Sequence, residues 1–178
     1  MHPLVSLAKK AIENYIRERK IIEIPNDIPK EFLEKKSGVF VTIEKNGQLR
    51  GCIGTYLPFY QNIAKEVVQN AISAATQDYR FEPVQKDELP ELSFTVYVLN
   101  KPEPVKTIEE LNPKKFGIIV KAIPSQEGNF FEKTGLLLPD LEGIDTTEKQ
   151  IFIACQKAGI NPLKEKFLIY KFTVEKYQ

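Results

Sequence analysis

Hydrophobic residues recur at helical spacing in three stretches of the chain. Over Leu4–Arg19 they fall three and four residues apart while charged residues fill the other positions, which predicts an amphipathic helix. The same spacing predicts a second helix over Tyr60–Gln77. A third helix is expected to begin at a cap formed by Thr146 or Thr147 and to run through Ala158.

Other stretches alternate or are rich in β-branched and aromatic residues, as strands are. Gly38–Glu44 and Gln48–Ile53 flank Asn46 and Gly47, a pair that readily adopts the left-handed conformations of a tight hairpin turn. Three further strands are predicted over Leu92–Leu99, Phe116–Ile123 and Phe167–Val174.

Helices and antiparallel strands in this irregular order are typical of an α+β fold with antiparallel or mixed sheets and about three main helices. A chain of 178 residues is long enough for one domain with one core or with two lobes, so we expect residues 1–178 to form a single domain. The apolar segment Gly135–Pro139 is either a short buried strand or part of an interaction groove, and the strand is the favoured interpretation.

Composition narrows the class of protein without naming a reaction. With a net charge of +1, the chain has no strong overall attraction to nucleic acid or to an anionic membrane, and it has no clear basic stripe. Nucleic acid and membrane are therefore not expected partners. Abundant lysine and glutamate beside scarce arginine fit either a thermophile or a lysine-rich codon bias. The chain starts without a signal-peptide pattern, which predicts a cytoplasmic location.

The supply of catalytic side chains is small. The only histidine is His2, which we expect in a mobile terminus. A Ser-His-Asp triad, a Cys-His pair and a zinc site are therefore not expected. No P-loop or dinucleotide fingerprint is present, and no cofactor or metal is predicted. The two cysteines, Cys52 and Cys155, are expected to be reduced, although the sequence alone leaves a bridge between them open. Cys155, in the middle of a predicted helix, is interpreted as a core residue.

The most distinctive segment is Leu49–Thr55, which reads LRGCIGT. It places Cys52 between two glycines and two residues after Arg50, one of only four arginines. A guanidinium nearby would favour the thiolate, and glycine allows a ligand or another chain to approach the backbone. The functional interpretation is a nucleophile, a redox thiol or a group lining a binding site. The alternative is that cysteine is simply the small apolar residue that fits between packed glycines.

A second candidate lies after the Tyr60–Gln77 helix. Asp78 and Arg80 are spaced to form a fixed charge pair or an anion clamp. The alternative is a structural salt bridge that closes the helix end, with Phe81 in the core. The acidic pairs Asp87-Glu88 and Glu109-Glu110 are interpreted as solvated or capping residues, because adjacent side chains point in different directions.

The Leu49–Thr55 segment resembles the signature of the AMMECR domain family, which includes AmmeMemoRadiSam system protein A. The resemblance extends over nearly the whole chain. The chain departs from the family pattern at Asp140-Leu141 and at Asn161–Leu163, where a tryptophan is common in the family. The other matching segments are Asp78-x-Arg80-Phe81-x-Pro83, Glu88-Leu89, Lys101–Glu103, Gly117–Val120, Gly135–Pro139 and Cys155-x-Lys157-Ala158-Gly159.

The resemblance implies an α+β fold of two unequal lobes with a cleft, no established activity, and an association with a Memo-like protein and a radical SAM enzyme. We therefore favour a binding or accessory module that holds a small molecule, a peptide or a partner protein. The alternative is a cysteine-dependent enzyme that uses Cys52 as nucleophile or redox thiol and Asp78 as acid or base. The residues expected to bind are Arg50, Gly51, Gly54, Thr55, Arg80 and Phe81.

Overall fold

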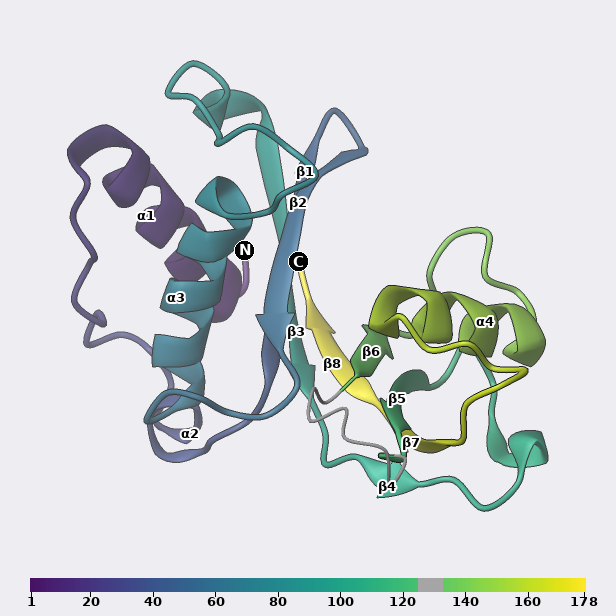
Figure 1. The fold of residues 1–178 in the computed structure, drawn as a ribbon. Coiled ribbons are helices and arrows are strands. Elements are labelled where there is room, and N and C mark those ends of the chain that lie inside the picture. Colours follow the sequence, from purple (N-terminus) through teal and green to yellow (C-terminus); the bar gives the residue numbers. More distant parts are fainter. Residues whose placement is uncertain (125–132) are drawn as a thin grey trace. The chain divides into compact units, whose positions relative to one another are not determined.

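The computed structural model describes residues 1–124 and 133–178 and confirms the predicted α+β class (Figure 1). It contains the three main helices that were predicted and one short helix, α2, that the hydrophobic pattern did not predict. The helices are α1 (Pro3–Glu18), α2 (Lys30–Glu34), α3 (Ile63–Thr76) and α4 (Thr147–Ala158). The strands are β1 (Val39–Lys45), β2 (Gln48–Thr55), β3 (Leu92–Leu99), β4 (Glu103–Pro104), β5 (Gly117–Ala122), β6 (Thr134–Leu137), β7 (Phe167–Phe172) and β8 (Val174–Tyr177).

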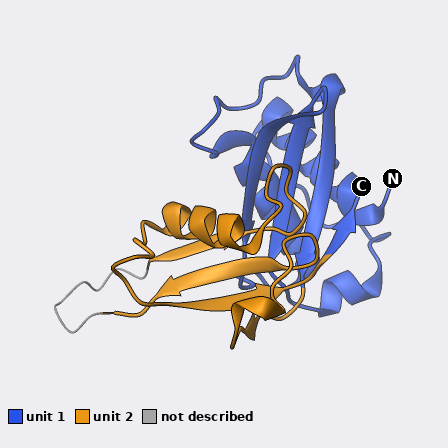
Figure 2. Cartoon of the chain, turned by 90° about the vertical axis from the view of Figure 1, so that its right-hand side faces the viewer, with its two compact units in different colours: residues 1–99, 175–178 blue, residues 100–174 orange. Residues whose placement is uncertain are grey.

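The chain divides into two compact units of unequal size (Figure 2). Unit 1 comprises residues 1–99 and 175–178, and unit 2 comprises residues 100–174. Unit 1 holds a sheet with the strand order β2-β1-β3-β8, and unit 2 holds a sheet with the order β4-β7-β5-β6. Unit 2 is therefore an insertion in the sequence of unit 1. Where the chain enters and leaves it, the backbone N–H of Asn100 donates to the carbonyl of Thr173 at 2.9 Å.

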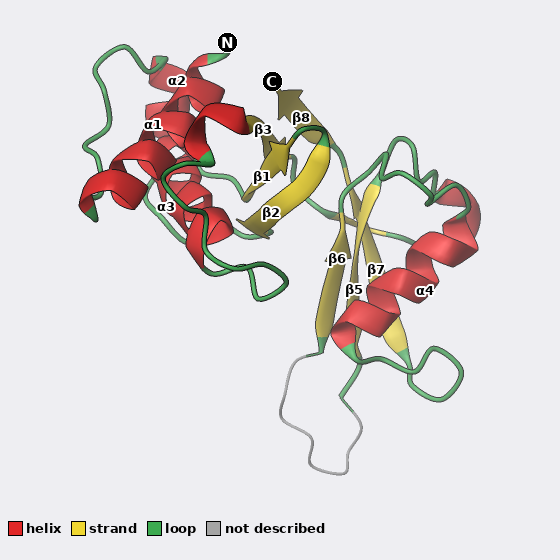
Figure 3. Ribbon diagram, turned by 90° about the horizontal axis from the view of Figure 1, so that it is seen from above, coloured by secondary structure: helices red, strands yellow, loops and turns green. Residues whose placement is uncertain are grey.

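The helices of each unit lie on one side of its sheet (Figure 3). In unit 1 the apolar stripe of α1 is buried with no more than 1% exposure at Leu4, Leu7 and Ile12. Alternate residues of β1, from Val39 to Ile43, point into the same core, as the period of a half-buried strand requires. In unit 2, α4 packs on β5 and β6, and its core includes Cys155, which confirms the expectation for that residue.

The predicted hairpin is confirmed. Asn46 and Gly47 take φ values of 53° and 76°, and β1 and β2 pair antiparallel on either side of them. The strand over Gly135–Pro139 is confirmed as β6, which pairs with β5. The helix predicted over Tyr60–Gln77 begins later than expected, because Asn62 accepts a hydrogen bond from the N–H of Lys65 and caps α3. No helix in the described ranges is long and apolar enough to span a membrane.

The single strand predicted over Phe167–Val174 is wrong. The segment is interrupted at Thr173, so β7 belongs to the sheet of unit 2 and β8 to the sheet of unit 1. The hydrophobic alternation continues through this point because both sheets bury apolar side chains. A period of two reports burial on one face, and it carries no information on which neighbouring strand provides the hydrogen bonds.

The expectation that His2 lies in a mobile terminus is also wrong. Nδ1 of His2 accepts a hydrogen bond from the N–H of Leu4 at 3.3 Å and caps α1. Its ring stacks on Tyr177 with the centroids 4.0 Å apart, and the edge of Phe32 lies 5.8 Å away. The single histidine therefore joins the first helix to the last strand of unit 1.

This geometry predicts that the stability of the protein depends on the charge of His2. Burial lowers the pKa of His2 below its ordinary value of 6.5, so the unfolded chain binds a proton more readily than the folded one. The stabilisation is complete above about pH 7 and is lost as the pH falls below 6.5. Thermal unfolding at pH 7.5 and 5.5 should show this loss, and His2→Asn, which keeps a capping side chain without titrating, should reduce it. Equal pH dependence in both proteins would contradict the assignment.

Candidate functional site

The LRGCIGT segment forms most of β2, the edge strand of the unit 1 sheet. Gly51 faces α3, and a Cβ on this residue would lie 2.3 Å from the backbone carbonyl oxygen of Ala74. Such a distance is far inside the contact radius of the two atoms. The glycine is therefore required by the close approach of the last turn of α3 to the strand.

Cys52 and Gly54 face the side of the sheet opposite α3. The hydroxyl of Thr42, directly across on β1, lies 3.2 Å from Sγ of Cys52. A Cβ on Gly54 would lie 2.2 Å from Cγ of Phe40, so the ring of Phe40 fills the space that a side chain at position 54 would take. The two glycines of the motif thus serve packing on opposite faces of one strand.

Asp78 binds the outer edge of β2. One oxygen of its carboxylate accepts the backbone N–H of Cys52 at 2.9 Å, and Nη2 of Arg80 donates to the carbonyl of Cys52 at 3.3 Å. The guanidinium of Arg80 also grips both Asp78 oxygens, at 2.9 and 2.7 Å. Asp78 and Arg80 therefore occupy the hydrogen-bonding positions that a neighbouring strand would take at Cys52.

These contacts decide what Asp78 can do chemically. The hydrogen bond from Arg80, helped by the N–H of Cys52, lowers the pKa of Asp78 from 3.8 to about 2. The same pairing raises the pKa of Arg80. Asp78 also accepts the backbone N–H of Arg80, which makes four donors, and a carboxylate with so low a pKa is a poor proton acceptor near neutral pH. The role of Asp78 in this geometry is to fix the strand edge and Arg80.

Arg50 is paired in the same way with Glu88, a residue interpreted from the sequence as solvated or capping. Nε and Nη2 of Arg50 donate to the two oxygens of Glu88, each at 2.9 Å, and Nη1 donates to the carbonyl of Glu82. The hydrogen bond from Arg50 lowers the pKa of Glu88 to about 2. Only 13% of the Glu88 side chain is exposed, so of its two interpretations the solvated one is wrong; its carboxylate also accepts the N–H of Gln85.

Phe81 lies between the two guanidinium groups. The centroid of its ring is 5.9 Å from Cζ of Arg50 and 5.5 Å from Cζ of Arg80, within the range of cation–π contacts. Phe81 is half-buried and does not enter the core, unlike the arrangement expected for a purely structural salt bridge. Both guanidinium groups therefore contact the same ring.

Thr55, the last residue of the motif, contacts a buried carboxylate that sequence reasoning missed. The hydroxyl of Thr55 donates to Glu66 at 2.5 Å, and the other oxygen of Glu66 accepts the N–H groups of Phe59 and Tyr60. Glu66 is fully buried on α3. The loop after β2 is therefore fixed from inside, although a single glutamate on an apolar helix face gives little sign of this in sequence.

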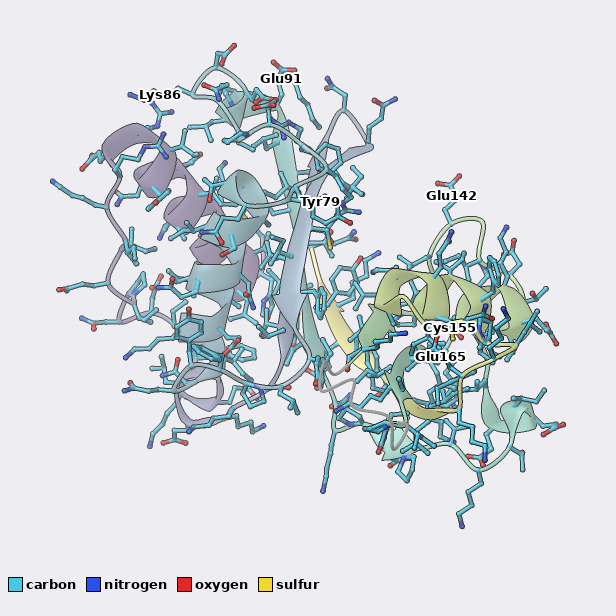
Figure 4. The ribbon with its side chains drawn as sticks, in the orientation of Figure 1. Tyr79, Lys86, Glu91, Glu142, Cys155 and Glu165 are labelled. Carbon is cyan, nitrogen blue, oxygen red and sulfur yellow. The ribbon has the colours of Figure 1, made fainter. Side chains whose placement is uncertain are left out.

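Large apolar side chains are exposed beside this hydrogen-bonded framework. Tyr79, between Asp78 and Arg80, is 96% exposed on the loop after α3 (Figure 4), and Phe59 is 81% exposed on the loop after β2. Leu57, on the same loop, is more than half exposed. We refer to the outer edge of β2 from Cys52 to Thr55, with Leu57, Phe59 and Tyr79, as the β2 edge surface.

The two cysteines, both present as thiols, differ in their surroundings. Cys52 is half-buried, and the guanidinium bonded to its carbonyl belongs to Arg80, whereas Arg50 pairs with Glu88. Cys155, on the buried face of α4, is completely buried, and burial raises the pKa of its thiol (Figure 4). Cys155 is therefore an internal reference for a slow thiol.

Other binding features lie apart from the motif. A pocket of about 280 Å³ on unit 1 is lined by Met1, by residues of α1, β1 and β3, and by Gln178, and none of its lining residues belongs to the motif. Within the described ranges, no group of three or more histidine, cysteine, aspartate or glutamate residues is placed to hold a metal ion.

The structure thus brings the predicted residues together around one strand of unit 1. Arg50, Gly51, Cys52, Gly54 and Thr55 lie on β2, and Asp78, Arg80 and Phe81 reach the strand from the loop after α3. Sequence reasoning missed Glu66 and the role of Glu88. The signal for Glu88 was present only as a matching segment of the family resemblance, because 38 residues separate it from Arg50.

Fold and site define a two-unit α+β protein built around a glycine-bounded cysteine on an edge strand. The chain belongs to the AMMECR1 family, whose model matches residues 5–177. A crystal structure of the uncharacterized protein PH0010 from Pyrococcus horikoshii matches with a TM-score of 0.85 and 36% identity, and the match covers 97% of this chain and 88% of that chain.

Relatives occur both as similar-sized proteins and as part of a longer one. A protein of Thermotoga maritima is 50% identical over 178 residues, covering 99% of this chain and 98% of the relative. Protein CA_C1420 of Clostridium acetobutylicum is 45% identical over 177 residues, covering 99% of this chain but only 36% of its own length. In the relative from Clostridium, the region that matches this chain is therefore part of a longer polypeptide. Relatives from Thermotoga, Thermococcus and Pyrococcus are consistent with the lysine- and glutamate-rich composition typical of thermophiles.

The contact at Gly51 predicts a large effect of one added methyl group. Gly51→Ala should lower the free energy of unfolding by about 1–3 kcal/mol, because the new Cβ would clash with the carbonyl of Ala74. Leu49→Ala is the matched control on the same strand, since its side chain is 44% exposed and its removal creates no clash. Urea unfolding followed by circular dichroism measures both, and equal stability of the two variants would contradict the close approach of α3.

The paired carboxylates predict how the free energy of unfolding decreases at acid pH. Asp78 and Glu88 have pKa values of about 2 in the folded protein, below their ordinary values of 3.8 and 4.5. Their stabilisation is therefore complete above about pH 5 and is lost as the pH falls toward 2. Asp78→Asn should cost about 2 kcal/mol at pH 7 and should lose less stability than the native protein between pH 5 and pH 3.

The control for this experiment is Asp27→Asn, at an exposed position in a loop of unit 1. It should match the native protein at each pH in urea unfolding. A decrease at acid pH as steep in Asp78→Asn as in the native protein would show that the Asp78–Arg80 pair does not govern it.

Proposed function

We propose that this protein is a binding module and that its contact surface is the β2 edge surface. One observation carries the proposal: the charged side chains in and around the motif are paired with one another, while apolar side chains beside them are exposed. Arg50 is paired with Glu88 and Arg80 with Asp78. Tyr79 is exposed on the loop that the Asp78–Arg80 pair holds, and Phe59 is exposed on the loop that Glu66 holds. Exposed aromatic residues on a rigid support are typical of protein interaction sites.

The chemistry of the site favours binding over catalysis. Asp78, the expected acid or base, is held ionised by Arg80 with a pKa of about 2. The paired guanidinium groups of Arg50 and Arg80 position loops, and their donors are already directed at protein oxygens. The framework therefore has the properties of a surface shaped in advance for a partner, which lowers the entropic cost of association.

We further propose that the partner is one of the proteins that the family resemblance implies, a Memo-like protein or a radical SAM enzyme in the cytoplasm. The relative from Clostridium, in which the matched region is 36% of a longer chain, supports a module that works beside another polypeptide. The test uses the purified Memo-like and radical SAM proteins encoded in the same genome, and biolayer interferometry measures their binding to the immobilised chain.

Arg80→Ala should weaken this binding at least tenfold, because it releases the loop that carries Tyr79, whereas Cys52→Ser should leave it within about twofold. Lys86→Ala, at an exposed position of the same loop region, is the control for a general loss of positive charge. Failure of both purified proteins to bind the native chain would contradict the assignment of these partners.

A cysteine-dependent reaction is the second candidate, and the position of Cys52 beside Arg80 and Thr42 favours it. Iodoacetamide labelling of the folded protein, followed by mass spectrometry between pH 6 and pH 9, separates the two functions. For a binding module we expect Cys52 to react no faster than an ordinary exposed thiol, and Cys155 to stay unreacted until the protein unfolds. Rapid labelling of Cys52 near pH 6 would instead indicate a stabilised thiolate and favour the enzyme.

A further inference from the structure

The outer edge of β2 carries hydrogen-bonding groups whose direction can be derived from the register. Thr42 lies opposite Cys52, and the N–H of Cys52 points away from β1, toward Asp78. Thr42 and Cys52 therefore form a non-hydrogen-bonded pair of the antiparallel ladder. Because the pattern repeats every two residues, Phe40 and Gly54 form the next such pair. The N–H and C=O of Gly54 consequently also point to the outer edge.

The outer edge is filled at Cys52 and open one step further along. At Cys52, Asp78 accepts the N–H and Arg80 donates to the carbonyl, as a neighbouring peptide unit would. At Gly54, no residue in the described ranges 1–124 and 133–178 supplies a hydrogen bond to the outward groups. An edge strand with outward backbone groups is a template for another extended chain.

We propose that the β2 edge surface binds an extended peptide segment of another protein, which continues the sheet by pairing with Gly54. This inference rests on the proposed binding function and specifies how the partner is held. The hydrogen-bonding pattern decides the class of ligand. The outward N–H and C=O of Gly54 lie as in a strand ladder, and the C=O and N–H of an extended polypeptide match them.

The exposed side chains indicate what the peptide should carry. Tyr79 lies next to Asp78 and Arg80 at one end of the open stretch, and Leu57 and Phe59 follow Thr55 at the other end. A segment lying between them would contact aromatic surface at both ends. We therefore expect bulky apolar residues in the bound peptide, with its backbone providing affinity and these side chains providing specificity.

The occupant is a different protein and not a second copy of this chain. In a symmetric pairing of two β2 strands, Cys52 of each copy remains covered by its own Asp78 and Arg80. Only the outward groups around Gly54 are left to pair, and without further contacts from the exposed loops these few hydrogen bonds are too short a ladder for a stable strand interface. A heterologous peptide can end at Asp78 and Arg80 and use the loops on both sides.

The test uses a phage-displayed library of random twelve-residue peptides, selected on the immobilised native chain, with the enriched peptides then synthesised. Fluorescence polarisation should show binding that weakens at least tenfold in Tyr79→Ala and in Phe59→Ala. Leu163→Ala, in unit 2, is the matched control because its side chain is 94% exposed, and it should change the affinity by less than twofold. N-methylation of alternate peptide residues should abolish binding, since it removes the backbone donors of a strand.

A direct readout is the amide of Gly54 in protein labelled with ¹⁵N-glycine, which contains nine glycines. Bound peptide should slow hydrogen exchange at Gly54 at least tenfold and leave Gly47 and Gly159 unchanged. Absence of enriched peptides, or peptide binding without protection of Gly54, would overturn the inference. Protection of Gly54 in a peptide-free dimer, detected by light scattering, would also overturn it and assign the edge to a second copy.

These outcomes separate the inference from the function on which it rests. Peptides could bind with affinities unchanged in Tyr79→Ala and Phe59→Ala and without slower exchange at Gly54. In that case strand pairing is wrong, while a binding module remains supported. If Cys52 reacts rapidly with iodoacetamide near pH 6 and no partner or peptide binds, both the inference and the binding function fail.

Discussion

The approach of α3 to β2 at Gly51 determines where Asp78 and Arg80 meet the strand. With the carbonyl of Ala74 only 2.3 Å from the place of a Cβ, the helix ends directly against the strand. The chain leaving α3 therefore begins beside the outer edge of β2. From there Asp78 can reach the N–H of Cys52, and Arg80 can reach the carbonyl of the same residue. A larger residue at position 51 would move the helix end and with it this pair of contacts.

Unit 2 uses the same device. A Cβ on Gly135 of β6 would lie 2.1 Å from the carbonyl of Ala154 on α4, and Nζ of Lys157 donates to the carbonyl of Leu136 at 2.8 Å. In both units a glycine on the edge strand admits a helix backbone, and a charged side chain then binds the strand edge. Edge strands are prone to unwanted pairing, and charged side chains on the edge oppose it. The glycines of LRGCIGT and GLLLP, Gly51 and Gly135, are therefore required for the same reason, the close approach of a helix backbone to the strand.

Local patterns predicted the elements of this fold well, because helices, the Asn46-Gly47 hairpin and most strands depend on neighbouring residues. The division of Phe167–Val174 between two sheets was not predictable, since it depends on which strands accept the hydrogen bonds on each side of Thr173. At the site, Asp78 and Arg80 are close in sequence and their pairing was among the alternatives. The contacts of Glu66 and Glu88 were not predictable from local patterns, because each forms only in the folded chain.

The insertion of unit 2 between β3 and β8 imposes an order on biosynthesis. The sheet of unit 1 receives its last strand only after residues 100–174 have been made. At about 5–20 residues per second, a ribosome needs roughly 4–15 s for that stretch. During this interval the nascent chain carries β3 without β8 beside it. During translation β3 is therefore an unpaired edge strand on this side, although β1 and β8 flank it in the finished molecule.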